Sequence, residues 1–140
     1  MPETRPKRGL LDTSVVIDLE RIDEGALPEE AAVSALTMAE LAAGTHATSD
    51  PGERARRQER LQRAEATFVP LAFDAGAARA YGRIYAAVAS RGRKARGRRA
   101  VDLLIAATAL AEGLPLYTRN PGDFSGLEDL IEVEAVDAPK

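Results

Sequence analysis

The chain has 140 residues, of which 45% are apolar and 29% charged, and its formal net charge is −3. This length and composition favour a globular protein, so we expect one domain over residues 1–140 with flexible ends at 1–8 and 138–140. The absence of cysteine excludes disulfides, thiolate metal sites and a cysteine nucleophile. No secretion signal is recognisable, and no apolar run reaches the ~20 residues of a membrane helix. We therefore expect a cytoplasmic protein without a membrane partner.

Short strand patterns and helix patterns alternate along the chain. Strands are expected at 9–12, 31–36, 67–71 and 114–118, with an edge strand at 131–136. Helices are expected at 13–22, 37–47, 50–66 and 75–91, and a last helix with the apolar face Val101, Leu104, Ile105 and Thr108 stops at Gly113. Residues 23–31 form a turn or a short helix. This alternation predicts a three-layer α/β fold, with a mainly parallel central sheet of four to five strands flanked by helices.

Polar residues are expected where the strands end. Asp12 ends the first strand, Glu40 lies early in the helix after the second, and Asp102 lies in the first turn of the last helix. Asn120 and Asp123 follow the strand at 114–118. In open parallel sheets ligands bind beyond the carboxyl ends of the strands, so these side chains are candidates for one site.

Each of these acids also has a structural interpretation. Asp12 can cap the helix that follows it, and Glu40 has the spacing of a capping box with Thr37. Asp123 is a typical turn residue, whereas Asp102 lies among apolar residues and is harder to explain structurally. Carboxylates that cluster favour a hard cation such as Mg²⁺ or Mn²⁺. Zinc is disfavoured because His46 is the only histidine and there is no cysteine.

Four segments together resemble a known family. The segments LLDTSVVIDL, SALTMAELAAG, RAVDLLIAATAL and LYTRNPGDF have the order and approximate spacing of the PIN domain. The whole chain is similar to VapC-type toxin ribonucleases of bacterial type II toxin–antitoxin pairs. The resemblance implies a Mg²⁺-dependent endoribonuclease that inhibits translation and growth until a VapB-like antitoxin binds it. It also implies a homodimer.

The resemblance assigns roles to individual residues. Asp12, Glu40 and Asp102 correspond to the acidic cluster of the family, with Asp12 and Asp102 as direct metal ligands. Glu40 or Asp123 would position or deprotonate the attacking water. Asn120 stands where many relatives have aspartate, which leaves open whether Asp123 replaces that acid and whether one or two ions bind. Residues that would orient carboxylates or water are Thr13, Ser14 and Thr118.

A basic strip occupies residues 91–99. It holds six cations and no acid, namely Arg91, Arg93, Lys94, Arg96, Arg98 and Arg99. The strip could be a solvated loop, because Gly92 and Gly97 interrupt helix formation. Its position just before Asp102 favours the alternative, a clamp for RNA phosphates, since arginine can donate two hydrogen bonds to one phosphate. Without an aromatic residue, the strip gives no support to base stacking.

Two rival functions remain open at the level of the sequence. A phosphoacceptor receiver domain also gathers acids around Mg²⁺, but it needs a lysine after a late strand, and Lys7, Lys94 and Lys140 are not so placed. A PIN-like RNA- or protein-binding module without catalysis is the other rival, and Asn120 favours it. Metal-dependent cleavage of RNA would separate the enzyme from both. The second aspartate of the first motif, Asp18, is expected to face solvent or to pair locally.

Overall fold

A four-stranded sheet forms the centre of the protein. The computed structural model describes residues 7–92 and 98–137. Within these residues the strands are β1 (Arg8–Leu11), β2 (Glu30–Val33), β3 (Leu116–Thr118) and β4 (Val133–Ala135). Their order is β2-β1-β3-β4, and every neighbouring pair is parallel. The predicted parallel sheet is confirmed, and β4 is an edge strand as expected.

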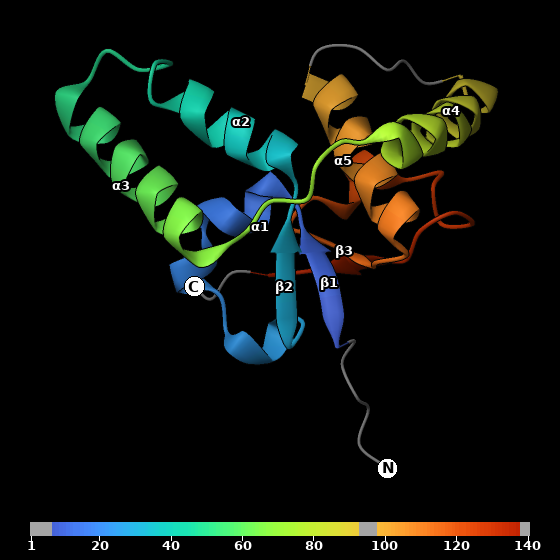
Figure 1. Cartoon of the computed structure of the whole chain (residues 1–140), viewed down its shortest axis with the longest axis horizontal. Coiled ribbons are helices and arrows are strands. Elements are labelled where there is room, and N and C mark those ends of the chain that lie inside the picture. Colours follow the sequence, from blue (N-terminus) through green and yellow to red (C-terminus); the bar gives the residue numbers. More distant parts are fainter. Residues whose placement is uncertain (1–6, 93–97, 138–140) are drawn as a thin grey trace.

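Helices flank this sheet. In chain order they are α1 (Thr13–Ile17), α2 (Ala35–Gly44), α3 (Pro51–Thr67), α4 (Ala75–Ser90) and α5 (Arg98–Glu112), with short 3₁₀ turns η1 (Leu19–Arg21), η2 (Glu24–Ala26) and η3 (Pro121–Phe124). The α2–α3 hairpin and the α4–α5 pair lie on opposite sides of the carboxyl ends of β1 and β2 (Figure 1). Gly113 ends α5 as predicted, with a φ of +67° that glycine adopts without strain.

The register of the strands places their carboxyl ends together. Leu11 is opposite Val33 on one side and Tyr117 on the other. The backbone N–H of Asp12 donates to the carbonyl of Tyr117 over 2.8 Å, which extends this pairing by one residue. Asp12 and Thr118 therefore lie on adjacent strands at one edge of the sheet, as the sequence predicts.

The expected strand at 67–71 is wrong. Leu71 forms only an isolated parallel bridge with Ser34, by donating to the carbonyl of Val33 and accepting from the N–H of Ala35. Pro70 has no N–H to contribute to a ladder, and the neighbouring Val69 is 91% exposed, so the segment has neither the bonds nor the burial of a sheet strand.

Three helix boundaries also differ from expectation. The helix expected at 13–22 ends at Ile17 and continues as the 3₁₀ turn η1. Helix α2 begins at Ala35, because Ser34 Oγ accepts from the N–H of Leu36 over 2.8 Å and caps the helix there. Thr37 is thus inside the helix and the predicted capping box is wrong. Helix α5 already begins at Arg98, so Asp102 lies in its second turn.

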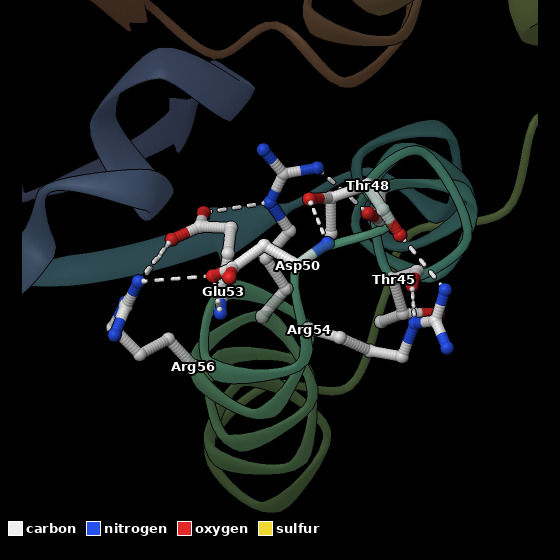
Figure 2. Close-up of polar contacts among 8 residues, drawn as sticks. Thr45, Thr48, Asp50, Glu53, Arg54 and Arg56 are labelled. Atoms are coloured by element: carbon white, nitrogen blue, oxygen red, sulfur yellow. Dashed lines mark hydrogen bonds and ion pairs between the residues drawn. The ribbon is translucent and has the colours of Figure 1, made fainter.

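Arginines from α3 hold the end of α2 in place (Figure 2). Arg54 donates to the carbonyls of Thr45 and Thr48 over 3.1 and 2.8 Å, and Arg57 donates to the carbonyl of Gly44 over 2.8 Å. Carbonyls at a helix C-terminus lack partners within the helix, so these bonds satisfy groups that would otherwise need water. They join α2, which carries Glu40, to the longer α3.

Two clusters of buried side chains form the core. Leu10 belongs to the cluster under α4 and α5, with Ile84, Leu103 and Phe124. Leu11 belongs to the cluster under α1, α2 and α3. Consecutive strand residues point to opposite faces, which explains this division. Each fully buried leucine contributes about 1.5–3 kcal/mol, and together the pair fixes the end of β1 and hence Asp12.

The apolar face predicted for α5 is only partly correct. Ile105 and Thr108 are buried, but Val101 and Leu104 are partly exposed. Leu103, Ala106 and Ala107 are fully buried instead. The helix packs against α4 and also against α2 and η3, so it buries more than the single stripe that a periodicity identifies.

Candidate active site

Asp12 accepts hydrogen bonds through both of its carboxylate oxygens. Its side chain is almost fully buried, at 4% exposure. Oδ1 accepts from the backbone N–H of Thr13 over 2.9 Å, while Oδ2 accepts from the hydroxyls of Ser14 and Thr118, each over 2.8 Å. The structural interpretation is confirmed, since Asp12 caps α1. Its other oxygen joins the end of β1 to β3, and its functional role stays a prediction.

Among the residues that the structure describes, the hydrogen bonds leave one acceptor position on Asp12 unoccupied. Each oxygen of an ionised carboxylate offers about two acceptor positions. Both positions of Oδ2 are used by hydroxyls, whereas Oδ1 carries one N–H. A cation that binds Asp12 would therefore approach Oδ1, and the donors on Oδ2 prevent rotation of the carboxylate.

Glu40 is connected to the same end of the sheet through Thr13. The Thr13 hydroxyl donates to Glu40 Oε1 in a short hydrogen bond, and it also lies 2.9 Å from the hydroxyl oxygen of Thr37. Thr13 thus uses its backbone for Asp12 and its side chain for Glu40. One residue sets the spacing of two carboxylates that are 28 positions apart in the sequence.

The segment after β3 completes this hydrogen-bond network. The N–H of Arg119 donates to Ser14 Oγ over 3.1 Å, and the N–H of Asn120 donates to Thr118 Oγ1 over 3.0 Å. The side chain of Asn120 is exposed and does not cap η3. Asn120 thus enters the network through its backbone. Asp123 lies half-buried in η3, where its N–H donates to the carbonyl of Asn120 over 3.0 Å.

The predicted acids are brought together to different degrees. Hydrogen bonds join Asp12 and Glu40 through Thr13, whereas Asp102 lies half-buried on α5 beside the fully buried Leu103. Across residues 7–92 and 98–137, no three acidic or histidine side chains converge as a ready-made metal site. The geometry of Asp102 relative to the other acids therefore stays a prediction.

The donor set at Asp12 and Glu40 fits a hard cation. The network consists of carboxylates, hydroxyls and backbone amides, and it contains no sulfur or imidazole. Magnesium binds through one or two protein carboxylates and retains several waters, so a complete protein cage is not required. His46 is exposed, as expected of a surface residue.

A hollow of about 600 Å³ lies elsewhere, between α1 and α3. It is lined by apolar side chains that include Val16, Leu19 and Phe68, and by arginines of α3. None of the side chains that bond to Asp12 or Glu40 lines it. The bonded acids Asp12 and Glu40 thus lie apart from this hollow.

Asp18 has a partner that sequence reasoning missed. Besides the expected local partner, Arg21 at 3.7 Å, Asp18 forms an ion pair and hydrogen bond with Arg119. This contact joins the residue that follows α1 to the residue that follows β3, 101 positions away. Asp18 is a structural residue next to the site, and only the pairing of β1 with β3 could have identified Arg119.

Thr37 is the other residue that sequence reasoning misassigned. Its side chain is fully buried at 0% exposure and points to Thr13 instead of capping α2. The spacing of Thr37 and Glu40 correctly indicated that the two residues are neighbours on a helix. Residues three positions apart are neighbours everywhere along a helix, so the spacing does not identify the first turn.

The basic strip lies mostly outside the described residues. This applies to Arg93, Lys94 and Arg96 and to the side chain of Arg98. Arg91 is exposed and lies against Gly126, where a Cβ would come within 2.8 Å of its Cδ. The pKa of Glu128 is lowered, first by backbone hydrogen bonds from Glu128 and Gly126 and less by the charge of Arg91.

Arg99 differs from Arg91. Its Nε and one terminal nitrogen are buried, and within the described part of the chain they have no hydrogen-bond partner. Buried donors without partners are rare in folded proteins and cost about 1–3 kcal/mol. Arg99 lies on α5 about one turn before Asp102.

Comparison with known proteins agrees with this geometry. The PIN domain family matches residues 9–129. Ribonuclease VapC5 of Mycobacterium tuberculosis is 36% identical over 136 residues, which cover 95% of this chain and 97% of that protein.

Solved structures agree as well. The crystal structure of VapBC-5 from Mycobacterium tuberculosis, a member of the VapBC family of toxin–antitoxin systems, matches with a TM-score of 0.80 and 36% identity and covers 95% of this chain and 100% of its own. FitAcB from Neisseria gonorrhoeae matches with a TM-score of 0.70 and 29% identity, over 89% and 94% of the two chains.

The family match includes the predicted site residues from Asp12 to Asp123. The matches exclude the receiver-domain alternative, because the family match spans both the segment of Asp12 and the segment of Thr118. No helix in the described ranges is long and apolar enough to cross a membrane. The chain belongs to the PIN-domain family and, within it, to the VapC ribonucleases.

Proposed function

We propose that this chain is a divalent-metal-dependent endoribonuclease that acts as the toxin of a toxin–antitoxin pair in the cytoplasm. The observation that carries the proposal is Asp12, a buried carboxylate whose neighbour Thr13 also holds Glu40. Relatives that match the chain over nearly its whole length are VapC ribonucleases.

Asp12, through Oδ1, and Asp102 are the residues that we propose as ligands of the metal ion. PIN-domain ribonucleases generally use a divalent metal, and we propose Mg²⁺, with Mn²⁺ as a substitute, because the donors are all oxygen. When bound, the ion would supply positive charge that polarises a phosphoryl oxygen and makes water easier to deprotonate.

The chain's own residues then hold the reacting groups. Ser14 and Thr118 fix the Asp12 carboxylate through Oδ2, so its other oxygen keeps one direction. Thr13 holds Oε1 of Glu40, and Oε2 would accept the proton of the attacking water. Asp123 is the alternative proton acceptor, since it also follows the carboxyl end of β3. Attack by water requires no covalent intermediate with the protein.

Arg99 would bind a phosphate of the RNA. Its buried donors lack partners within the described residues, and one phosphate group can accept two parallel hydrogen bonds from one guanidinium. The other cations of the strip, Arg91, Arg93, Lys94, Arg96 and Arg98, would attract the RNA backbone before it reaches the acids.

Cleavage of pooled RNA by the purified chain tests this function. We expect cleavage with Mg²⁺ or Mn²⁺, none with EDTA, and a loss of at least about 100-fold in Asp102→Asn with an unchanged thermal midpoint. Metal-independent cleavage, or full activity of Asp102→Asn, would contradict the mechanism. Metal-insensitive RNA binding without cleavage would instead indicate the catalytically impaired binding module.

The partners of the toxin can be tested separately. The VapBC-5 relative was solved as a toxin–antitoxin system, and we propose a VapB-like antitoxin and a homodimer for this chain. Size-exclusion chromatography with light scattering should give twice the 14.9 kDa mass of one chain. Co-expression with its antitoxin should restore growth that the wild type arrests, and Asp102→Asn should be harmless without it.

A further inference from the structure

A threonine of α2 has its hydroxyl directed at the acidic site. Thr37 is fully buried, and its Oγ1 lies 2.9 Å from Oγ1 of Thr13, which in turn donates to Glu40. The three residues come from two elements, α1 and α2, and Glu40 lies one turn beyond Thr37 on the latter. Their side chains therefore form a chain of hydrogen bonds that begins and ends on one helix.

Counting the available hydrogens shows which group donates in each of these hydrogen bonds. A threonine hydroxyl has one hydrogen to donate, and an ionised carboxylate can only accept. Thr13 uses its hydrogen on Glu40, so the hydrogen between the two threonines must come from Thr37. Hydroxyls that donate along a chain strengthen one another's bonds, so Thr37 makes Thr13 a better donor to Glu40.

Another buried threonine, Thr108, forms its hydrogen bond within its own helix. Thr108 on α5 is 1% exposed, and its hydroxyl donates to the carbonyl of Leu104, four residues earlier, over 3.1 Å. That bond is the usual local choice of threonine within a helix. Thr37 is equally buried, but it lies in the first turn of α2 and directs its oxygen to a neighbouring element.

We propose that Thr37 is a positioning residue for Glu40, acting through Thr13. The inference rests on the proposed ribonuclease function, in which Glu40 accepts a proton with Oε2. If Thr37 sets the Thr13 hydroxyl, its loss leaves that hydroxyl less fixed in direction and weakens the bond that holds Oε1 of Glu40. Substrate binding does not involve Thr37, because its side chain has no exposed surface.

Two substitutions at Thr37 separate the hydroxyl from the shape of the side chain. Thr37→Val keeps the volume and removes the hydroxyl, and we expect kcat to fall about 10- to 100-fold, as for other residues that orient a primary ligand or base. The KM for RNA should stay within about twofold. Thr37→Ser keeps the hydroxyl and should retain most of the wild-type kcat.

Thr108→Val is the matched control, because it removes a hydroxyl of equal burial from a different helix. We expect it to leave kcat unchanged even where it lowers the thermal midpoint. The ¹³C carboxyl shift of Glu40 in the metal-free protein gives a readout independent of activity. It should move in Thr37→Val and stay unchanged in Thr108→Val.

The outcomes distinguish this inference from the proposed function. If Glu40→Gln is inactive but Thr37→Val keeps full kcat, the role of Thr37 is overturned and the enzyme function stands. An equal loss of kcat in Thr37→Ser and Thr37→Val would also overturn it, since the hydroxyl would not be the cause. If Glu40→Gln itself is fully active, the proposed role of Glu40 in the reaction fails first.

Discussion

Two regions close to the candidate site differ in how their polar groups are satisfied. At the carboxyl ends of β1 and β3, Asp12 accepts three hydrogen bonds and is held before any ligand arrives. At the start of α5, Arg99 has buried donors that are unpartnered within the described residues. In the first region, folding itself supplies the hydrogen-bond partners of Asp12. In the second region, we infer that the substrate supplies the partners of Arg99. The acidic site can therefore be rigid while the group that binds the anion stays available.

The largest effect is expected from a substitution of Asp12, whose hydrogen bonds are supplied by the fold. Asp12→Asn removes the charge that a metal would bind, and it presents an amide to one or more of the three donors. We expect activity to fall below about 1% and stability to fall by about 1–3 kcal/mol, because a bond to a charged group is lost in a buried place. Cleavage assays and urea unfolding measure the two effects. Wild-type activity in this variant would remove Asp12 from the mechanism.

The second largest effect is expected from a substitution of Arg99, whose buried donors lack partners among the described residues. Arg99→Gln should weaken RNA binding by about 10-fold and reduce the slope of log affinity against log salt by about 0.7, the value for one phosphate contact with a single strand. Folding stability should not fall, because two of the buried donors that the substitution removes have no partner among the described residues. Arg79→Gln, an exposed cation of α4, is the control and should leave both unchanged. A large loss of stability in Arg99→Gln would indicate a structural arginine instead.

A smaller effect is expected next to the satisfied region. Arg119→Ala removes the ion pair with Asp18 but leaves the backbone bond from Arg119 to Ser14 Oγ. We expect stability to fall by up to about 1 kcal/mol, as for partly exposed ion pairs, and kcat to stay within about twofold. Thermal unfolding and cleavage kinetics check this. A collapse of kcat would show that the ion pair, and not the backbone, positions Ser14.

The smallest effect is expected at Glu132 and Glu134, two neighbouring acids at the C-terminal strand of the sheet. Glu134 on β4 forms a side-chain hydrogen bond with Glu132, which raises the pKa of Glu134 above its ordinary 4.5, and partial burial adds to the shift. A raised pKa in the folded state means that the folded protein holds this proton more tightly. The pair therefore costs stability as the pH rises through 4.5 and above, and the cost is absent at lower pH.

Glu134→Gln should thus stabilise the protein slightly at pH 7 and have no such benefit below pH 4. The gain should be under about 1 kcal/mol, since the strand lies at the sheet edge and is partly exposed. Unfolding midpoints at a series of pH values measure it. Equal midpoints for wild type and variant at pH 7 would contradict the stated origin of the pKa shift.

Several parts of the fold could be predicted from local patterns. The parallel sheet, the edge strand and the end of α5 at Gly113 followed from alternation and turn chemistry. Predictions failed where the same local sequence pattern is compatible with two different structures. The segment around Val69 has strand composition but forms only one isolated bridge, between Leu71 and Ser34. Thr37 and Glu40 have capping-box spacing inside a helix that Ser34 already caps.

The sequence by itself determined the family, the strand ends that carry acids and the identity of Asp12 as the leading candidate. These depend on residue type and order, which motifs and hydrophobic periodicity record directly. Only the tertiary structure decided that Thr13 joins Asp12 to Glu40, that Thr37 supports Thr13 and that Arg99 has unpartnered donors among the described residues. Such pairings depend on how β1, α2 and α5 pack, and no local sequence window contains the side chains that packing brings together.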